Sequence, residues 1–175
     1  MTYPIRFYGD SVLRKRAQEV TIFNEEIKQF IAGLVRTMFA HPAAGLAAPQ
    51  VGKSLRIFAR RNCNIDEDGN IEYTDSQVFV NPRITILDDA LQIDDEACLS
   101  IPGIREDVVR PVRIHVEALD GEGNPFTEEL EGYRARVILH ENDHINGVLF
   151  VDRVDHKVRK RIEPLLRVIK KKYTN

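Results

Sequence analysis

The residues best suited to chemistry lie near the C-terminal end of the chain, where residues 140–144 read HENDH. On a helix, residues four apart lie on the same face, so the imidazoles of His140 and His144 can bind one metal ion. Glu141 follows the first histidine and can take a proton from a water molecule that the metal makes more acidic. The pattern predicts metal-dependent hydrolysis, but it is only moderately specific, because glutamate and histidine are also common on exposed helices.

A catalytic metal needs a third protein ligand, and the sequence offers few positions for it. A metzincin-type third histidine would stand where this chain has Phe150, which excludes that arrangement. Glu163 lies at a distance that suits a thermolysin-type ligand, but its basic neighbours favour a charge pair along an exposed helix. Cys98 lies upstream, and a thiolate is a good ligand for zinc or ferrous iron, whereas a single cysteine is ordinarily a buried, unreactive thiol. Residue type and spacing alone leave this choice open.

Three separated blocks of sequence resemble the three motifs of the peptide deformylase family, in that family's order. They are GLAAPQ at residues 45–50, EACLS at residues 96–100 and HENDH at residues 140–144. The flanking segments at residues 12–15, 79–82 and 147–152 are similar to the family as well, so the resemblance covers roughly residues 4–172. It implies that Cys98, His140 and His144 hold one divalent metal ion and that Glu141 is the general base and acid.

The resemblance also implies an activity. The chain would be a metal-dependent hydrolase that removes the formyl group from the N-terminal formyl-methionine of newly synthesised polypeptides, so nascent formyl-methionyl peptides are the expected partner. The expected physiological metal is Fe2+, and Zn2+, Ni2+ and Co2+ are ions that the same thiolate and imidazole ligands accept.

Two hydrogen-bond donors for the developing oxyanion follow from the resemblance. They are the backbone N–H of Leu99 and the side-chain amide of Gln50, each of a kind worth several kcal/mol in a site without water. The resemblance further implies that Gly45 and Ala97 present their backbones to the bound peptide.

The side chain of the substrate methionine needs an apolar pocket. Helical spacing places Tyr133 and Val137 on the face that carries His140, and Ala44 could form another wall. A pocket of this kind would suit an unbranched apolar side chain. Ordinary core packing is an equally good explanation of Tyr133 and Val137.

The sequence departs from the family pattern at three positions. Ala43 and Ala97 stand where glycine is usual, and Leu139 stands where glutamine is common. Glycine permits a positive φ and the close approach of a peptide backbone, so we expect a slightly tighter cleft around unchanged metal ligands. These alanines leave open a deformylase-like binding protein with a structural metal and no turnover. An endopeptidase is the other alternative, although no suitable third ligand follows the helix.

Glu96 and Arg110 are expected to form an ion pair that steadies the metal-binding loop. The expectation rests partly on the resemblance and partly on the chemistry of a carboxylate two residues before Cys98, facing the basic residues Arg105 and Arg110. The alternative is two unrelated surface charges, worth at most about 1 kcal/mol if they meet.

The composition is that of an ordinary globular protein, and we expect one domain over residues 1–175. Of the 175 residues, 43% are hydrophobic and 30% are charged, which argues against disorder. The N-terminus lacks an apolar signal segment, and no stretch approaches the length of a membrane span. The two cysteines, Cys63 and Cys98, do not suggest a disulfide framework. We therefore expect a cytoplasmic protein, and neither DNA nor a membrane as a partner.

Positive charge is concentrated at the C-terminal end of the chain. Residues 154–175 carry eight Lys or Arg and two Asp or Glu, a net charge of +6, so the remainder must carry −8 to give the overall −2. Apolar residues at helical spacing predict a basic helix at about residues 155–172, which Pro164 should bend or break. Such a helix can simply dock on the core; the alternative, which the resemblance encourages, is contact with the RNA of the ribosome.

The order of elements predicts an α+β fold, with antiparallel β-sheets around a central HExxH helix and with N-terminal and C-terminal helices. Asn24 should cap the N-terminal helix, which should end before His41. Alternating apolar residues and turn signals predict the strands. They are expected at residues 55–59, 77–80, 84–87 and 113–119 and from Phe126 onwards.

Overall fold

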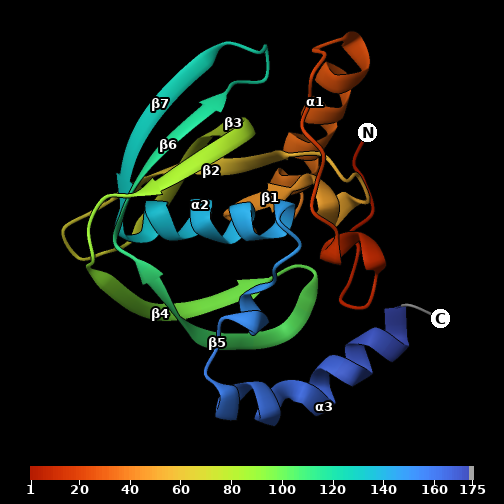
Figure 1. The fold of residues 1–175 in the computed structure, drawn as a ribbon, viewed down its shortest axis with the longest axis vertical. Helices are drawn as coiled ribbons and strands as arrows, with labels where there is room; N and C mark the ends of the chain where they lie inside the picture. The colour runs from red at the N-terminus through yellow and green to blue at the C-terminus, as the bar shows by residue number, and fades with distance from the viewer. Residues whose placement is uncertain (174–175) are drawn as a thin grey trace.

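The computed structural model describes residues 1–173, so residues 174 and 175 of the expected domain lie outside it. In this part the α-helices are α1 (Glu25–Phe39), α2 (Gly132–Ile145) and α3 (His156–Tyr173), and the short 3-10 helices are η1 (Ser11–Arg14), η2 (Ala48–Val51) and η3 (Phe150–Asp152). The strands are β1 (Gly45–Ala47), β2 (Ile57–Ile65), β3 (Ile71–Ile86), β4 (Leu91–Cys98), β5 (Ile101–Pro111), β6 (Arg113–Leu119) and β7 (Pro125–Glu131). Figure 1 shows α2 between a large sheet and the β4–β5 hairpin, which confirms the expected α+β fold.

The N-terminal helix α1 begins at the predicted cap. The side chain of Asn24 accepts a hydrogen bond from the backbone N–H of Ile27 at 3.0 Å, which satisfies one of the unpaired donors of the first turn. The helix ends at Phe39, and the ring nitrogen Nδ1 of His41 then lies 2.8 Å from the carbonyl oxygen of Thr37. One face of α1 packs against β1 and β2. Its buried apolar residues are Phe30, Ile31, Leu34 and Met38.

The larger sheet is antiparallel, with the strand order β1-β2-β3-β6-β7. The strand predicted at residues 113–119 is β6, and β7 pairs with it along its whole length. The strands predicted separately at residues 77–80 and 84–87 fall in one long strand, β3, which ends at Ile86. An irregularity between Val80 and Arg83 shifts the pairing there, so the alternation of apolar residues is interrupted although the strand continues.

The second sheet consists of β4 and β5, and neither strand is among those that the sequence predicts. Asp94, Asp95 and Glu96 lie within β4, and acidic residues are poor strand formers, so the acidic run hides the alternation. The inner face of the hairpin is buried in the core, where Ile104 and Val108 of β5 take part in one hydrophobic cluster. The hairpin therefore brings the block EACLS, at the end of β4, next to α2 (Figure 1).

The central helix α2 is enclosed by other elements, and several of its buried residues are polar or charged. They are Arg136, Glu141, Asp143 and His144. The helix stops at Asn146, and Gly147 follows with a φ of 75°. A Cβ atom at Gly147 would lie 2.6 Å from the carbonyl oxygen of Arg14, so this glycine permits both the end of the helix and the close approach of the N-terminal segment.

The N-terminal segment joins the three blocks that resemble family motifs. Its backbone N–H groups donate hydrogen bonds to one carbonyl oxygen in or beside each block, at 2.7, 2.8 and 2.9 Å. The pairs are Arg6 with Gln50, Tyr8 with Ser100 and Ala17 with Ile145. Because the three blocks are far apart in sequence, these bonds help to fix their relative positions.

The C-terminal helix α3 packs on the core through three apolar residues, Ile162, Leu166 and Ile169, which join the cluster that contains residues of β5. Pro164 was expected to bend or break the helix, and the helix does not break there: it is continuous from His156 to Tyr173. A proline removes only one helical hydrogen bond, and the buried residues Ile162 and Leu166 on either side of it keep both halves packed on the core. Within residues 1–173, no helix is both long enough and apolar enough to cross a membrane.

Candidate metal centre

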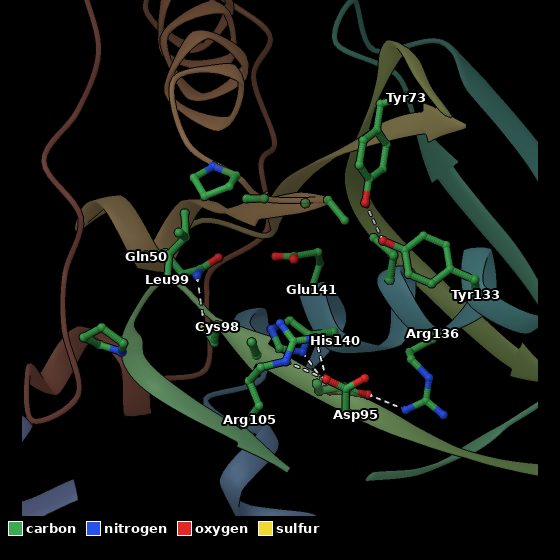
Figure 2. A pocket seen from close by; sticks show the side chains of 18 residues that line it. Gln50, Tyr73, Asp95, Cys98, Leu99, Arg105, Tyr133, Arg136, His140 and Glu141 are labelled. Atoms are coloured by element: carbon green, nitrogen blue, oxygen red, sulfur yellow. Dashed lines mark hydrogen bonds and ion pairs between the residues drawn. The ribbon is translucent and has the colours of Figure 1, made fainter. Parts of the chain in front are cut away.

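Three side chains with metal-ligating atoms meet between β4 and α2: Cys98, His140 and His144. Their ligand atoms all lie within 4.8 Å of one another, and the Cys98 Sγ atom is 3.3 Å from Nε2 of His144. Cys98 is the last residue of β4, whereas the two histidines are one turn apart on α2. The hairpin thus brings the thiol to the helical pair that the sequence predicts as ligands. Figure 2 shows Cys98 and His140 of this group.

The geometry of these three side chains fits a metal ion. A tetrahedral ion with the usual metal–sulfur and metal–nitrogen distances would hold its ligand atoms about 3.5 Å apart, close to the sulfur–nitrogen distance observed here. One thiolate and two imidazoles are ligands that zinc and ferrous iron both accept. The site is also enclosed, since His144 is 1% exposed and Cys98 is 8% exposed.

Glu96 fixes the orientation of His140. The ring nitrogen Nδ1 of His140 lies 2.8 Å from Oε2 of Glu96, which leaves Nε2 as the nitrogen that can face a metal. Burial by itself would raise the pKa of Glu96, but hydrogen bonds from Arg110 and His140 hold this pKa far below its ordinary value. Glu96 is therefore a charged carboxylate behind the metal-ligating ring.

The ion pair predicted between Glu96 and Arg110 is confirmed, and it is buried. Arg110 donates from Nε and from a terminal nitrogen to the two carboxylate oxygens at 2.8 and 2.9 Å. Arg136 donates to the same carboxylate at 2.9 Å, and Arg110 also donates to Asp143 at 2.7 Å. Arg153 binds the other side of Asp143. The sequence gives little signal for Arg136 and Arg153, because their partners are distant in the chain.

Glu141 is a buried carboxylate of a different kind. It is 4% exposed, and its Oε2 atom has no hydrogen-bond partner. Burial raises the pKa of this carboxyl to about 7. Figure 2 shows its carboxylate pointing into the pocket on the side of Gln50. A Cβ atom at Gly45 would lie 2.6 Å from Oε1 of Glu141, so the glycine of the first block is needed for this close approach.

Gln50 is held beside the thiol by its own hydrogen bonds. Its Oε1 atom accepts from the backbone N–H of Ala47 at 2.8 Å, which orients the amide. Its Nε2 atom then donates towards Sγ of Cys98 at 3.4 Å and the hydroxyl of Ser100 at 3.3 Å. The side-chain amide of Gln50 is thus an oriented donor at the metal centre.

A pocket of about 420 Å³ opens beside these groups. It lies between the segment around β1, the edge of β4 and one side of α2 (Figure 2). All the site residues predicted from the sequence line it, apart from the more deeply buried His144. Those residues are Ala44, Gly45, Gln50, Ala97, Cys98, Leu99, Tyr133, Val137, His140 and Glu141.

The two alanines that replace family glycines, Ala43 and Ala97, also line this pocket. Among the described residues, Asn81 is the only one other than glycine with a positive φ, so neither alanine adopts a strained backbone. Ala97 lies in the extended strand β4. The two methyl groups are therefore accommodated without left-handed geometry, and they narrow the pocket only by their own volume.

Tyr73 is a pocket residue for which the sequence gives no clear signal. It lies on β3, and its hydroxyl is 2.6 Å from the hydroxyl of Tyr133 on α2. Burial and this hydrogen bond raise the pKa of Tyr133, so the phenol stays protonated. The paired tyrosines form one wall of the pocket (Figure 2). Only the folded sheet brings residues 60 positions apart together in this way.

Glu163 and the second cysteine, Cys63, do not line this pocket. Glu163 pairs with Arg159 and Arg167 along α3, as its basic neighbours predict. Cys63 is a free, half-buried thiol on β2, beyond the part of that strand that pairs with β1. It lines an adjacent cavity of about 260 Å³, which shares Tyr133 and Val137 with the first pocket.

Known proteins resemble this chain along most of its length. The family model for polypeptide deformylase matches residues 2–160. A peptide deformylase of Thermotoga maritima is 40% identical over 173 residues, which are 97% of this chain and 99% of that protein. One of Clostridium botulinum is 45% identical over 155 residues, or 87% of this chain and 97% of that protein.

The fold agrees with the sequence comparison. The crystal structure of peptide deformylase from Thermus thermophilus matches with a TM-score of 0.86 and 40% identity, and the match covers 98% of this chain and 99% of the other. A peptide deformylase from Legionella pneumophila matches with a TM-score of 0.84 and 35% identity over 100% of this chain and 99% of the other. Because both sequence and fold match over nearly the whole chain, this protein belongs to the polypeptide deformylase family.

Proposed function

We propose that this chain removes the formyl group from the N-terminal formyl-methionine of newly synthesised polypeptides, at the pocket beside Cys98, His140 and His144. The observation that carries the proposal is the meeting of these three ligands with a buried carboxylate, Glu141, that has no hydrogen-bond partner on one oxygen. The reaction adds water across the formamide bond, and its products are formate and a free amino terminus.

Cys98, His140 and His144 would hold one divalent metal. Such an ion, when bound, is a Lewis acid that makes a water molecule nucleophilic near neutral pH. We propose Fe2+ as the physiological ion, although Zn2+, Ni2+ and Co2+ suit the same ligands. Anaerobic purification followed by metal analysis and activity measurements tests this choice; an iron-free preparation that is fully active with zinc alone would contradict it.

Glu141 moves the proton. Its carboxylate would take a proton from the attacking water and then give that proton to the nitrogen of the leaving amine. A carboxyl with a pKa of about 7 is suited to both halves of this task near neutral pH. Gly45, which has no side chain, leaves room for Glu141 to reach the substrate.

The oxyanion that forms on the formyl oxygen needs donors that are already oriented. The amide of Gln50 is positioned for this role by its bond to Ala47, and the backbone N–H of Leu99 follows directly after the cysteine ligand. Each such donor contributes several kcal/mol to stabilising the transition state in a buried site.

The peptide itself would lie between the first and second blocks. Gly45 and Ala97 would present their backbones to it from opposite walls of the pocket. The methionine side chain would enter the part of the pocket bounded by Ala44, Tyr133 and Val137. This part favours an unbranched side chain, because it is bounded by a small residue and by side chains fixed on α2.

One assay separates this function from its alternatives. Formate release from formyl-Met-Ala-Ser, measured beside the cleavage of casein, should show turnover of the formyl peptide alone. Cleavage of casein would indicate an endopeptidase. Tight binding of the formyl peptide without formate release, in a metal-loaded protein, would indicate a binding protein.

A labelling experiment tests Cys98 as a ligand without measuring turnover. The thiol should resist alkylation while metal is bound and should react after chelation, whereas Cys63 should react equally in both states. Equal labelling of Cys98 with and without metal would rule it out as a ligand.

We further propose a cytoplasmic location and contact with the ribosome through the basic side of α3. The location is supported by a free thiol among the three metal ligands, which a reducing compartment preserves. The ribosome contact is supported by exposed basic residues on α3, among them Arg161, Lys171 and Lys172. Cosedimentation with ribosomes should be lost, with full activity on short peptides, when Lys171 and Lys172 are changed to Glu.

A further inference from the structure

The outer face of the β4–β5 hairpin carries a continuous series of side chains that begins at the pocket. Residues directly opposite each other in an antiparallel pair point to the same face. Along the hairpin these pairs are Ala97 with Arg105, Asp95 with Asp107, Ile93 with Val109 and Leu91 with Pro111. The intervening residues of β4 and β5, such as Glu96 and Val108, are buried on the inner face.

Three apolar residues of this outer face are exposed to solvent. Leu91 is 65% exposed, Ile93 is 69% exposed and Val109 is 48% exposed. We call these three residues the apolar track. Ile93 and Val109 are cross-strand partners, so the track is one patch of the hairpin surface and not a set of scattered side chains.

The apolar track is continuous with the pocket. Asp95, Ala97 and Arg105 line the pocket and lie on the same face of the hairpin as the track. Ala97 and Ile93 are four residues apart on one strand, a separation of about 13 Å. An extended peptide whose second or third residue lies beside Ala97 would therefore reach Ile93 with about its sixth or seventh residue.

The outer edge of β4 does not offer the peptide an alternative route. Arg136 donates hydrogen bonds to the backbone carbonyl oxygens of Asp94 and Gln92, at 3.3 and 3.2 Å. The side-chain amide of Gln92 is itself bound to the carbonyl oxygen of Gly132 at 2.9 Å. The two carbonyl oxygens and the Gln92 amide are thus already bound within the protein, so a chain that leaves the pocket along β4 meets the side chains of the outer face instead.

We propose that the apolar track binds the segment of the nascent polypeptide that follows the formyl-methionine. This inference rests on the proposed function and adds a preference to it: substrates with apolar residues at about positions six to eight bind more tightly than short ones. Asp107 lies between the pocket and the track, and it has no ion-pair partner among residues 1–173. A basic residue just before the apolar ones would therefore strengthen binding.

The test compares three substrates. They are formyl-Met-Ala-Ser, a nine-residue formyl-Met-Ala-Ser-Gly-Lys-Leu-Val-Leu-Lys, and the same nine-residue peptide with Ser in place of Leu, Val and Leu. For the protein with its natural sequence, KM should be about tenfold lower for the apolar peptide than for the other two, because a few apolar side chains become covered. The value of kcat should change little, because the reacting groups are the same.

Two double variants complete the test. Ile93→Ser with Val109→Ser should abolish the advantage of the apolar peptide and leave formyl-Met-Ala-Ser unaffected. Ile65→Ser with Ile71→Ser is the matched control, because these residues are also exposed cross-strand partners, on β2 and β3. The inference is overturned if the apolar peptide has no advantage, if both double variants lose it equally, or if the track holds a second copy of the chain, seen as a dimer that dissociates in the Ile93/Val109 variant.

Binding of fluorescently labelled versions of the nine-residue peptides, measured by anisotropy, does not depend on turnover. If the protein binds the apolar peptide with a tenfold lower Kd but releases no formate, the apolar track is supported and the proposed function is contradicted. If the protein releases formate equally well from all three substrates, the proposed function is supported and the apolar track is contradicted.

Discussion

Two of the networks of arginine and carboxylate in this protein differ mainly in burial. At the metal centre, Glu96 binds Arg110 and Arg136, and all three side chains are 2–4% exposed. On α3, Glu163 binds Arg159 and Arg167, and these side chains are 28–78% exposed. The nitrogen–oxygen distances are similar, 2.8 and 2.9 Å in the first network against 2.6 and 3.3 Å in the second.

The comparison shows that contact distance does not measure what an ion pair does. In the exposed network, water screens the charges, and each pair contributes about 0–1 kcal/mol. In the buried network, every charge has lost its water and depends on its partners, so the removal of one member leaves the remaining charges buried with fewer partners. The buried network also contacts the candidate metal centre, because Glu96 orients the ring of His140.

The largest expected effect is on stability, from Arg110→Met. This change leaves Glu96 and Asp143 without their shared cation, and the free energy of unfolding should fall by about 3–5 kcal/mol. Urea denaturation followed by circular dichroism measures it. The matched control is Arg167→Met, which removes an arginine from the exposed network and should cost less than about 1 kcal/mol. An equal loss of unfolding free energy in the two variants would mean that burial does not determine how much an ion pair contributes to stability.

The second effect concerns Glu141, a buried carboxylate that belongs to neither network. Glu141→Gln keeps the shape of the side chain but removes its ability to accept a proton, so turnover of formyl-Met-Ala-Ser should fall about a hundredfold or more. Stability should be unchanged or higher, because a buried charge without a partner is lost. Near-normal turnover in a metal-loaded Glu141→Gln protein would remove Glu141 from the proposed mechanism.

A third, smaller effect is expected from Glu96→Gln. The amide can still accept a hydrogen bond from His140, but it no longer supplies negative charge behind the ring, so metal affinity should fall about 10- to 100-fold. Competition with a chelator, followed by metal analysis, measures the affinity. Retention of metal as in the unaltered protein would show that Glu96 acts only in folding.

The smallest effect is expected from Glu163→Gln on α3. Its arginine partners are well exposed, so the free energy of unfolding should change by less than about 0.5 kcal/mol, and both metal content and turnover should stay the same. A loss of metal from this variant would revive Glu163 as a ligand, contrary to its position on α3.

Much of the centre can be inferred from the sequence because its parts are local. The spacing of His140 and His144 places both rings on one helical face, and Glu141 lies between them. The assignment of Cys98 as the third ligand rests on the family resemblance. No local sequence rule connects a residue of β4 to a helix that begins more than thirty positions later. The ion pair of Glu96 and Arg110 was likewise expected, but its burial was not.

Other parts could not be predicted for identifiable reasons. The sequence does not predict the strands β4 and β5, because acidic residues such as Asp94 and Asp95 have low strand propensity. These residues occupy a strand because their side chains lie on the exposed face of the hairpin or beside the pocket. Tyr73 and Arg136 show no pattern of their own in the sequence. Their roles depend on partners on other elements, Tyr133 for the first and Glu96 for the second.

By itself, the sequence determined the features that depend on neighbouring residues. These include the cap of α1 at Asn24, the helical spacing of the histidines and the end of α2 at Asn146 and Gly147. Tertiary structure alone decided which charges are buried, because burial depends on which distant segments cover a side chain. Glu96 and Glu163 are the same amino acid with similar partners, and only the packing of β4 against α2 buries the first beside His140 and leaves the second in water.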